Sequence, residues 1–348
     1  MKKIFSVFFA LLTVLLSLCG CADAEKSTDE MFALDTIITF CIYSSDENIS
    51  TDTISKCKDE IIRLENMLSA TKKGSDVYNI NHSDAKKVSV SDETIRLLQK
   101  ARKLSESCDG AFDVSVYELV KLWGFDTKEY KVPTSDEVEK TLRYVGYSDV
   151  TIDKNDVLLK KGMSIDLGAI AKGYIGERLY DIMKNSEIDA GIINLGGMVV
   201  TYSSENSSKE FSVGVEYPDT GDVFAKLNVS KPFTVTSGGY QRYFEKDSKR
   251  YHHILDPKTG KPSESDISSV TVISDDGVAN DALSTAFYVM GVDETLEYLK
   301  NHNADVEDGY SVIILSSDKS QVFVSEKLKA DGFELLDGYE KEININYV

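Results

Sequence analysis

The sequence predicts an α+β fold: a single domain in which helices pack on a largely antiparallel sheet. Two observations predict it. Segments of helical spacing and segments of strand-like alternation come in mixed blocks rather than in strict β-α-β alternation. No internal repeat, low-complexity run or linker interrupts the chain after residue 30. The chain has 348 residues, 42% of them hydrophobic, which suits one large domain over residues 31–348.

The first 20 residues are typical of a bacterial lipoprotein signal. Lys2 and Lys3 precede an apolar run that is short for a membrane span and suited to a secretory signal. The run ends in Leu-Cys-Gly-Cys, which resembles a lipobox with Cys21 as the lipidated residue. An ordinary signal peptide that is cut nearby is the alternative. We expect residues 21–30 to form a polar tether and the protein to be anchored at the outer face of the cytoplasmic membrane.

The charge of the chain argues against nucleic acid as a partner. The formal net charge is −19, and the charged residues are spread along the chain rather than gathered in a tail. Binding to nucleic acid needs a basic face, which this composition does not favour.

Three cysteines remain once Cys19 leaves with the signal and Cys21 serves as the anchor. Cys41 lies in a strand pattern and Cys57 on the apolar face of a helix, so we expect both in the core. The chain has no C-x-x-C motif and no predicted zinc site. A disulfide among Cys41, Cys57 and Cys108 stays open.

The first half of the chain is predicted to be mainly helical. Ser91 is a predicted N-cap, and Thr134 with Glu137 forms a capping box. We expect a strand over residues 32–43, helices over 51–69, 91–107, 115–123 and 134–144, a loop or short turn over 75–81, and a hairpin of 150–152 with 157–159.

The second half begins with a helix and continues mainly as strands. Apolar residues recur at helical spacing from Ile170 to Met183, directly after a strand-like start at Met163 and Ile165. We then expect strands over 192–201, 211–216, 225–229, 234–237, 251–255 and 269–273, helices over 279–290 and 293–301, and a closing strand pair of 311–315 and 322–324.

The start of the 168–183 helix could bind a phosphate. Gly168 and Ala169 would present free backbone groups with no bulky side chain in the way. Asp166 could accept a hydrogen bond or face a metal, and Lys172 could reach a phosphate as a point charge. The alternative is a helix with an aspartate near its N-cap and one exposed lysine.

Asp281 and Thr285 form a second candidate group. They are four residues apart at a helix start, so their side-chain oxygens face the same direction. With a carbonyl from elsewhere they would give a hard-oxygen set that suits Mg²⁺. The alternative is an aspartate that interacts with the helix dipole and a threonine that faces the core.

His252 and His253 precede a turn, Asp256-Pro257-Lys258-Thr259-Gly260. On a strand, adjacent side chains point to opposite faces, so at most one histidine serves a given site. That residue could act as a general base, or both could be structural.

Three glycine-containing segments complete the candidates. Residues 109–114, Asp-Gly-Ala-Phe-Asp-Val, could frame a flat ring or simply end one helix and lead to the next. The Gly-Gly at 196–197 indicates close backbone approach or a plain bulge. A Thr-Ser-Gly segment at 236–238 precedes the histidine pair.

Taken together, these segments resemble the ApbE family of FAD:protein FMN transferases. They occur in the family's order and span nearly everything past residue 30. The matching segments are Ser75 to Asn81, Asp109 to Val114, Leu122 to Phe125, Asp166 to Tyr174, Ile193 to Gly197, Thr236 to Gly238, Tyr251 to Gly260 and Asp281 to Thr285.

The resemblance implies a protein that binds FAD and Mg²⁺, moves the FMN half of FAD onto a threonine hydroxyl of an exported or membrane redox protein, and releases AMP. The implied metal ligands are Asp281, Thr285 and the main-chain carbonyl of Ala169. His253 is our choice for the base, with His252 as the alternative, and Lys172 would neutralise charge beside the metal. The implied contacts to FAD are Ala111, Phe112, Asp113, Asp166, Lys172, His253 and Ile254.

The chain departs from the family pattern at four places. Leu34-Asp35-Thr36 replaces a Met-Gly-Thr, Gly239 replaces an aspartate, Met198 an asparagine and Thr71 a tyrosine. These changes affect the expected flavin contacts more than the metal site. Competing hypotheses are an Mg²⁺-dependent FAD pyrophosphatase, a non-catalytic FAD-binding lipoprotein and a flavin-free solute-binding lipoprotein.

Overall fold

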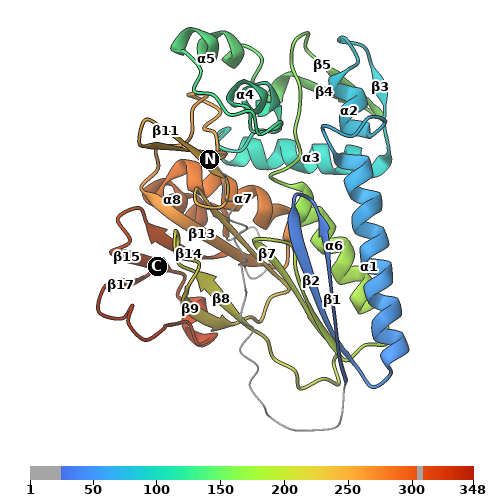
Figure 1. Ribbon diagram of the computed structural model, residues 1–348, viewed down its shortest axis with the longest axis vertical. Helices are drawn as coiled ribbons and strands as arrows, with labels where there is room; N and C mark the ends of the chain where they lie inside the picture. The colour runs from blue at the N-terminus through green and yellow to red at the C-terminus, as the bar shows by residue number, and fades with distance from the viewer. Residues whose placement is uncertain (1–24, 304–308) are drawn as a thin grey trace, which may run out of the picture.

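The computed structural model describes residues 25–303 and 309–348, so the predicted signal, Cys21 and the first part of the tether lie outside the described residues (Figure 1). At its centre is a nine-stranded sheet in the order β1-β2-β6-β7-β10-β13-β14-β15-β17. Neighbouring strands are antiparallel, apart from the parallel pair β15 and β17. The α+β fold with a largely antiparallel sheet is confirmed.

The strands are distributed over four sheets. The large sheet consists of β1 (Glu25–Ala33), β2 (Thr36–Ser44), β6 (Ala190–Asn194), β7 (Met198–Ser203), β10 (Phe233–Gly238), β13 (Ile267–Ser274), β14 (Ser311–Ser316), β15 (Gln321–Val324) and β17 (Asn344–Tyr347). The small sheets are β16 (Glu334–Leu335) with β9 (Val223–Asn228) and β8 (Ser212–Glu216), β3 (Val88–Ser89) with β5 (Asp156–Leu159) and β4 (Val150–Asp153), and β11 (Tyr243–Lys246) with β12 (Lys249–His252).

The N-terminal prediction was wrong in two respects. Residues 25–30, expected as a tether, belong to the edge strand β1, and the single strand expected over 32–43 is part of a hairpin. Its turn is Leu34-Asp35, where both residues have positive φ (54° and 61°), as a two-residue type I′ turn requires. The predicted strand over 192–201 is likewise two strands, β6 and β7, joined through Gly196 and Gly197.

The helices match the prediction more closely. The predicted caps are present: the Ser91 side chain accepts from the Thr94 N–H, and Thr134 with Glu137 forms a capping box. The loop expected over 75–81 is a short helix instead, capped by Ser75. The helices are α1 (Glu47–Leu68), α2 (Asp76–Asn81), α3 (Asp92–Ser107), α4 (Tyr117–Trp123), α5 (Ser135–Leu142), α6 (Ala171–Lys184), α7 (Gly277–Met290), α8 (Val292–His302) and α9 (Lys327–Ala330), with 3-10 turns η1 (Val114–Val116) and η2 (Tyr147–Asp149).

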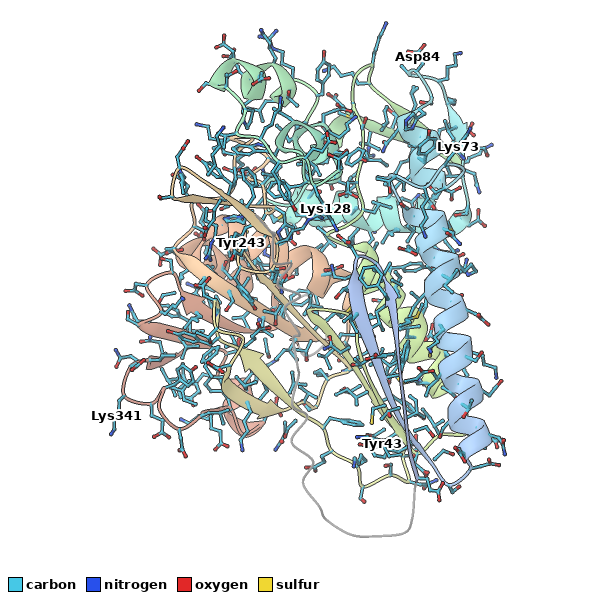
Figure 2. The ribbon with its side chains drawn as sticks, viewed as in Figure 1. Tyr43, Lys73, Asp84, Lys128, Tyr243 and Lys341 are labelled. Atoms are coloured by element: carbon cyan, nitrogen blue, oxygen red, sulfur yellow. The ribbon has the colours of Figure 1, made fainter. Side chains whose placement is uncertain are left out.

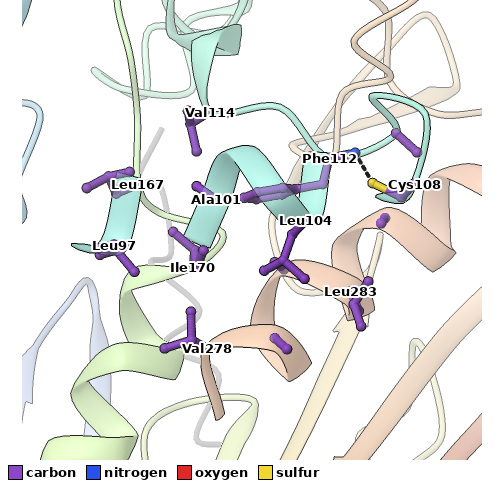
Figure 3. Packing of buried hydrophobic residues seen from close by; sticks show 14 of the residues in the cluster. Leu97, Ala101, Leu104, Cys108, Phe112, Val114, Leu167, Ile170, Val278 and Leu283 are labelled. Atoms are coloured by element: carbon purple, nitrogen blue, oxygen red, sulfur yellow. Dashed lines mark hydrogen bonds between the residues drawn. The ribbon is translucent and has the colours of Figure 1, made fainter. Parts of the chain in front are cut away.

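The molecule has three layers. Alternate residues of the large sheet face α1, α6 and α7 on one side, and the β8-β9-β16 sheet on the other; Ile42 and Tyr43 illustrate the two directions. Helix α3 packs on α7 and carries a core shared with Leu167 and Ile170, the residues that precede α6 (Figure 3). The starts of α6 and α7 are therefore fixed by one continuous core.

Cys41, Cys57 and Cys108 are all free thiols, so the disulfide that the sequence left open is not formed. Cys57 is buried, as predicted, and Cys108 is buried as well. Cys41, which was also expected in the core, is only partly buried. Burial raises the pKa of the Cys108 thiol, which keeps it protonated at neutral pH.

Candidate active site

The segment that leads into α6 is held on both sides by other elements. The Asn81 amide donates to the Ile165 carbonyl and accepts from the Ile165 N–H, both at 2.8 Å. The Asp166 N–H donates to the Val114 carbonyl at 2.7 Å, and the Asp166 carboxylate accepts from the Gly168 N–H at 3.1 Å. These bonds fix the backbone of the predicted phosphate-binding turn before the helix begins.

Helices α6 and α7 meet where the predicted metal ligands lie. The Asp281 side chain is 4% exposed, and its Oδ2 accepts from the Gly173 N–H at 2.9 Å. Gly173 is the third residue of α6, and the first N–H groups of a helix have no acceptor within it, so the Asp281 carboxylate supplies one. A Cβ on Gly173 would lie 2.3 Å from the Gly277 carbonyl oxygen, so the two helices can approach this closely only with glycine there.

A cation already stands beside Asp281. Lys172 Nζ lies 3.7 Å from Asp281 Oδ1 and 3.4 Å from the Gly168 carbonyl oxygen. Thr285, one turn further along α7, directs its hydroxyl back to the Asp281 carbonyl at 3.5 Å. Sequence positions far apart are thus brought together around one carboxylate.

These oxygens fit Mg²⁺ as a partial ligand set. In residues 25–303 and 309–348, no group of three or more His, Cys, Asp or Glu side chains could hold a metal on its own. Mg²⁺ does not require such a group, because it usually keeps several waters and binds through one or two carboxylates together with substrate phosphates. One buried carboxylate with a neighbouring hydroxyl agrees with that preference.

His253 is held in one tautomer by the hairpin that precedes it. Strand β11, which the sequence did not predict, pairs with β12 so that Tyr243 lies opposite His252. The ladder continues by one residue, because the His253 N–H donates to the Arg242 carbonyl at 3.0 Å. His253 Nδ1 lies 3.1 Å from the same oxygen, which can only accept. Nδ1 therefore carries the proton, and Nε2 keeps its lone pair.

Burial lowers the pKa of His253 to about 3. The positive charges of Arg242 and Lys172 also lower this pKa, whereas the hydrogen bond to the Arg242 carbonyl raises it. The imidazole is therefore neutral at physiological pH. A neutral ring with a free Nε2 is the form that a general base needs.

His252 faces the other side of the hairpin. Its Nε2 contacts the Ser263 carbonyl at 3.0 Å, and its ring meets that of Tyr288 edge-on at a centroid distance of 5.4 Å. A Cβ on Gly239 would lie 2.8 Å from His252 Cδ2 and 2.6 Å from the Tyr288 hydroxyl. The rings of His252 and Tyr288 therefore occupy the space that a side chain at position 239 would need. Gly239 replaces the aspartate of the family pattern at this position. This geometry favours His253 over His252 as the base.

The charges of two cations, Lys172 in α6 and Arg242 before β11, both act on the Asp166 carboxyl. Burial raises the pKa of its carboxyl, while the Gly168 N–H and the charges of Arg242 and Lys172 lower it. The charge of Lys172 thus acts on both Asp166 and His253.

The 111–113 segment contributes mainly support. Phe112 is 3% exposed, and its ring lies in the core against Leu104 (Figure 3). The Asp113 carboxylate accepts from the Ser115 N–H at 2.7 Å, the Ser115 hydroxyl at 2.6 Å and the Tyr147 N–H at 2.8 Å. Ala111 and Ile254 are buried as well. All four side chains are therefore buried.

Sequence reasoning missed Arg242. It lies on the turn between β10 and β11, and nothing in its local sequence marks it as a site residue. The sequence signal that could have led to it is the Asp247-Ser248 pair, a turn by composition, which would have predicted the hairpin. In the structure both residues have positive φ (53° and 59°), and their turn sets the hairpin register.

A buried carboxylate with hard-oxygen neighbours, a lysine and a neutral histidine on an α+β scaffold fit the class of phosphoryl-transfer enzymes. Comparison with known proteins agrees. The model of the ApbE family matches residues 34–308. The chain belongs to the ApbE family.

Individual relatives cover most of the chain. The FAD:protein FMN transferase of Klebsiella pneumoniae is 35% identical over 259 residues, 73% of this chain and 79% of that protein. The FAD:protein FMN transferase of Haemophilus influenzae is 28% identical over 322 residues, 88% of this chain and 92% of that protein. The crystal structure of the ApbE protein from Thermotoga maritima superposes with a TM-score of 0.81 at 32% identity, covering 88% of this chain and 99% of that one.

Proposed function

We propose that this protein is an FAD:protein FMN transferase, which moves the FMN half of FAD to a protein acceptor. The relatives that match most of its length carry that name. The observation that carries the proposal is the neutral His253, with Nδ1 fixed and Nε2 free, gathered with Asp166 and Lys172.

The acceptor group we propose is a threonine hydroxyl. His253 Nε2 takes the hydroxyl proton as the hydroxyl oxygen attacks the FMN-side phosphorus of FAD. The bond from that phosphorus to the bridging oxygen breaks, and the bridging oxygen leaves with the electron pair as part of AMP. Lys172 holds negative charge on the diphosphate during this exchange.

Asp281, Thr285 and the Ala169 carbonyl would hold Mg²⁺. When bound, the ion neutralises charge on the phosphate oxygens. The Gly173 N–H keeps the Asp281 carboxylate oriented toward that position.

We further propose that Cys21 carries a lipid anchor and that the protein acts at the outer face of the cytoplasmic membrane. The support is the Leu-Cys-Gly-Cys sequence that ends the apolar run. Over residues 25–303 and 309–348, no helix has the length and apolar character that a transmembrane span would need.

The test combines the purified protein with FAD, Mg²⁺ and a threonine-containing acceptor domain, and then measures the mass of the acceptor. Transfer gives a gain of one FMN. Free FMN and AMP without that gain would indicate a pyrophosphatase, and tight FAD binding without turnover would indicate storage.

The metal assignment has its own variant. Asp281→Ala removes the only carboxylate of the proposed ligand set, so Mg²⁺-dependent transfer should fall by about 100-fold or more. The control is Asp293→Ala, which removes an exposed carboxylate from the neighbouring helix α8. Mg²⁺-dependent turnover that persists in Asp281→Ala contradicts the assignment.

A further inference from the structure

Arg242 and His253 point to the same side of the β11–β12 hairpin. Directly opposed residues of an antiparallel pair share a face, and the His253 N–H bond to the Arg242 carbonyl makes these two residues opposed. The same face carries Phe244, which packs on Phe125 at a centroid distance of 5.7 Å. The opposite face carries Tyr243 and His252.

One nitrogen of the Arg242 guanidinium has a hydrogen-bond acceptor, whereas Nε has none among the described residues. Its Nη2 donates to the Phe125 carbonyl, and its guanidinium carbon lies 6.0 Å from the centre of the Phe125 ring. Nε is buried, and among the described residues it has no hydrogen-bond partner. A guanidinium with a buried donor left unpaired is incomplete without an acceptor, since buried polar groups are almost always bonded.

The surroundings of Arg242 indicate which kind of group could accept a hydrogen bond from its Nε. Arg242 acts electrostatically on Asp166 and on His253, and Lys172 acts on the same two residues. The two cations therefore act on one region, which contains the proposed base and the Asp166 carboxylate. A group with more than one negative charge, such as a diphosphate, complements that arrangement.

We propose that Arg242 is a second diphosphate-binding cation, which contacts the dinucleotide from the hairpin side while Lys172 contacts it from the α6 side. This inference rests on the proposed function for its ligand. It also assigns a reason for the hairpin itself: one residue supplies the carbonyl that fixes His253 and the guanidinium that holds the group His253 acts on.

The experiment measures binding of FAD and of riboflavin to the full chain by flavin fluorescence, with Mg²⁺ present throughout. Riboflavin has the ring and the ribityl chain but no phosphate. In Arg242→Gln, affinity for FAD should fall by about tenfold or more, because a charge-assisted contact is lost, while affinity for riboflavin stays within about twofold. Arg242→Lys should lie between wild type and Arg242→Gln.

Arg250→Gln is the matched control. Arg250 belongs to the same hairpin but lies on the other face, over the Tyr243 ring and paired with Asp219. Its replacement should leave both affinities within about twofold.

Two results would overturn the proposal: unchanged FAD affinity in Arg242→Gln, or equal losses for FAD and riboflavin, which would mean a purely structural role. If Arg242→Gln does not fold, the same comparison is decided on Arg242→Lys, where a selective loss of FAD affinity supports the proposal and unchanged affinity contradicts it. A wild-type protein that binds FAD without transferring FMN would refute the proposed function, yet these affinities would still decide the role of Arg242.

Discussion

At the scale of single residues, His253 combines a fixed tautomer with a strongly depressed pKa. Burial is the main cause of the depression, and Arg242 and Lys172 add to it. A base with so low a pKa is weak in the free protein. Binding of a diphosphate between the two cations would offset their charge and raise the pKa of the ring, so His253 should become a better base only when the substrate is present.

The pKa of His253 also predicts how stability depends on pH. The unfolded chain takes up a proton on this ring below about pH 6.5, whereas the folded protein does so only near pH 3. Between these values the unfolded state binds more protons, so the free energy of unfolding falls as pH is lowered. For this ring alone the loss between pH 7 and pH 5 is about 2 kcal/mol.

Chemical denaturation of the wild type and of His253→Gln at pH 7 and pH 5 checks this prediction. All other titrating groups are common to both proteins, so the variant should lose less stability on acidification. His252, whose pKa is also lowered by burial, remains in both and acts in the same direction. An equal loss in the two proteins would show that His253 titrates normally.

At the scale of elements, the α6–α7 contact organises the site. Gly173 and Gly277 allow the helix backbones to approach, and the Asp281 carboxylate then reaches the Gly173 N–H. A methyl group on Gly173 would meet backbone atoms of α7, which cannot turn aside as a flexible side chain can.

Gly173→Ala should therefore lower the free energy of unfolding by about 1–3 kcal/mol. It should also weaken Mg²⁺-dependent transfer, because the Asp281 carboxylate is held by the Gly173 N–H. The control is Gly176→Ala in the same helix. Its Cβ would lie 2.2 Å from Met198 Cε, the free end of a flexible side chain that can move. Thermal melts of both variants should show the larger loss for Gly173→Ala, and equal losses would contradict the argument.

The elements also show what the sequence could predict. The helices and their caps depend on local patterns, so Ser91 and Thr134 located them correctly. Strand β1 was missed because it lies at the sheet edge and exposes polar residues such as Glu25 and Glu30, which look like a tether. Strand β17 was missed because its partner β15 pairs with it in parallel from a distant segment.

The same distinction holds for the site. Asp281 and Thr285 are four residues apart in one helix, so their common direction was visible in the sequence. Arg242 required the register of a hairpin, and the bond from Gly173 to Asp281 joins residues 108 positions apart. Spacing along the chain cannot give such long-range contacts.

At the scale of the whole molecule, the large sheet carries helices on one face and a small sheet on the other, and α6 packs against α7 on the helical face (Figure 1). The tip of the β1–β2 hairpin is joined to the α4–α5 connection by an ion pair of Asp35 with Lys128 at 2.9 Å. Lys128 is labelled in Figure 2. Position 35, one of the departures from the family pattern, therefore has a structural role here.

The whole protein should be held at a membrane through its N-terminus. Cys21→Ala, expressed in a bacterium, should move the protein from the membrane fraction to the soluble fraction and abolish labelling by a fatty-acid analogue. The matched control is Cys41→Ala, which removes a free thiol from strand β2. Membrane association that survives Cys21→Ala would contradict the lipid anchor.

The ammonium of Lys172 beside Asp281 has a consequence for the order of events. A divalent ion that arrives alone would be repelled by a tethered positive charge that cannot diffuse away. A nucleotide that brings its own negative charge gives the lysine another partner and leaves the carboxylate to the ion. Metal and nucleotide should therefore enter as one unit, and each should bind poorly in the absence of the other.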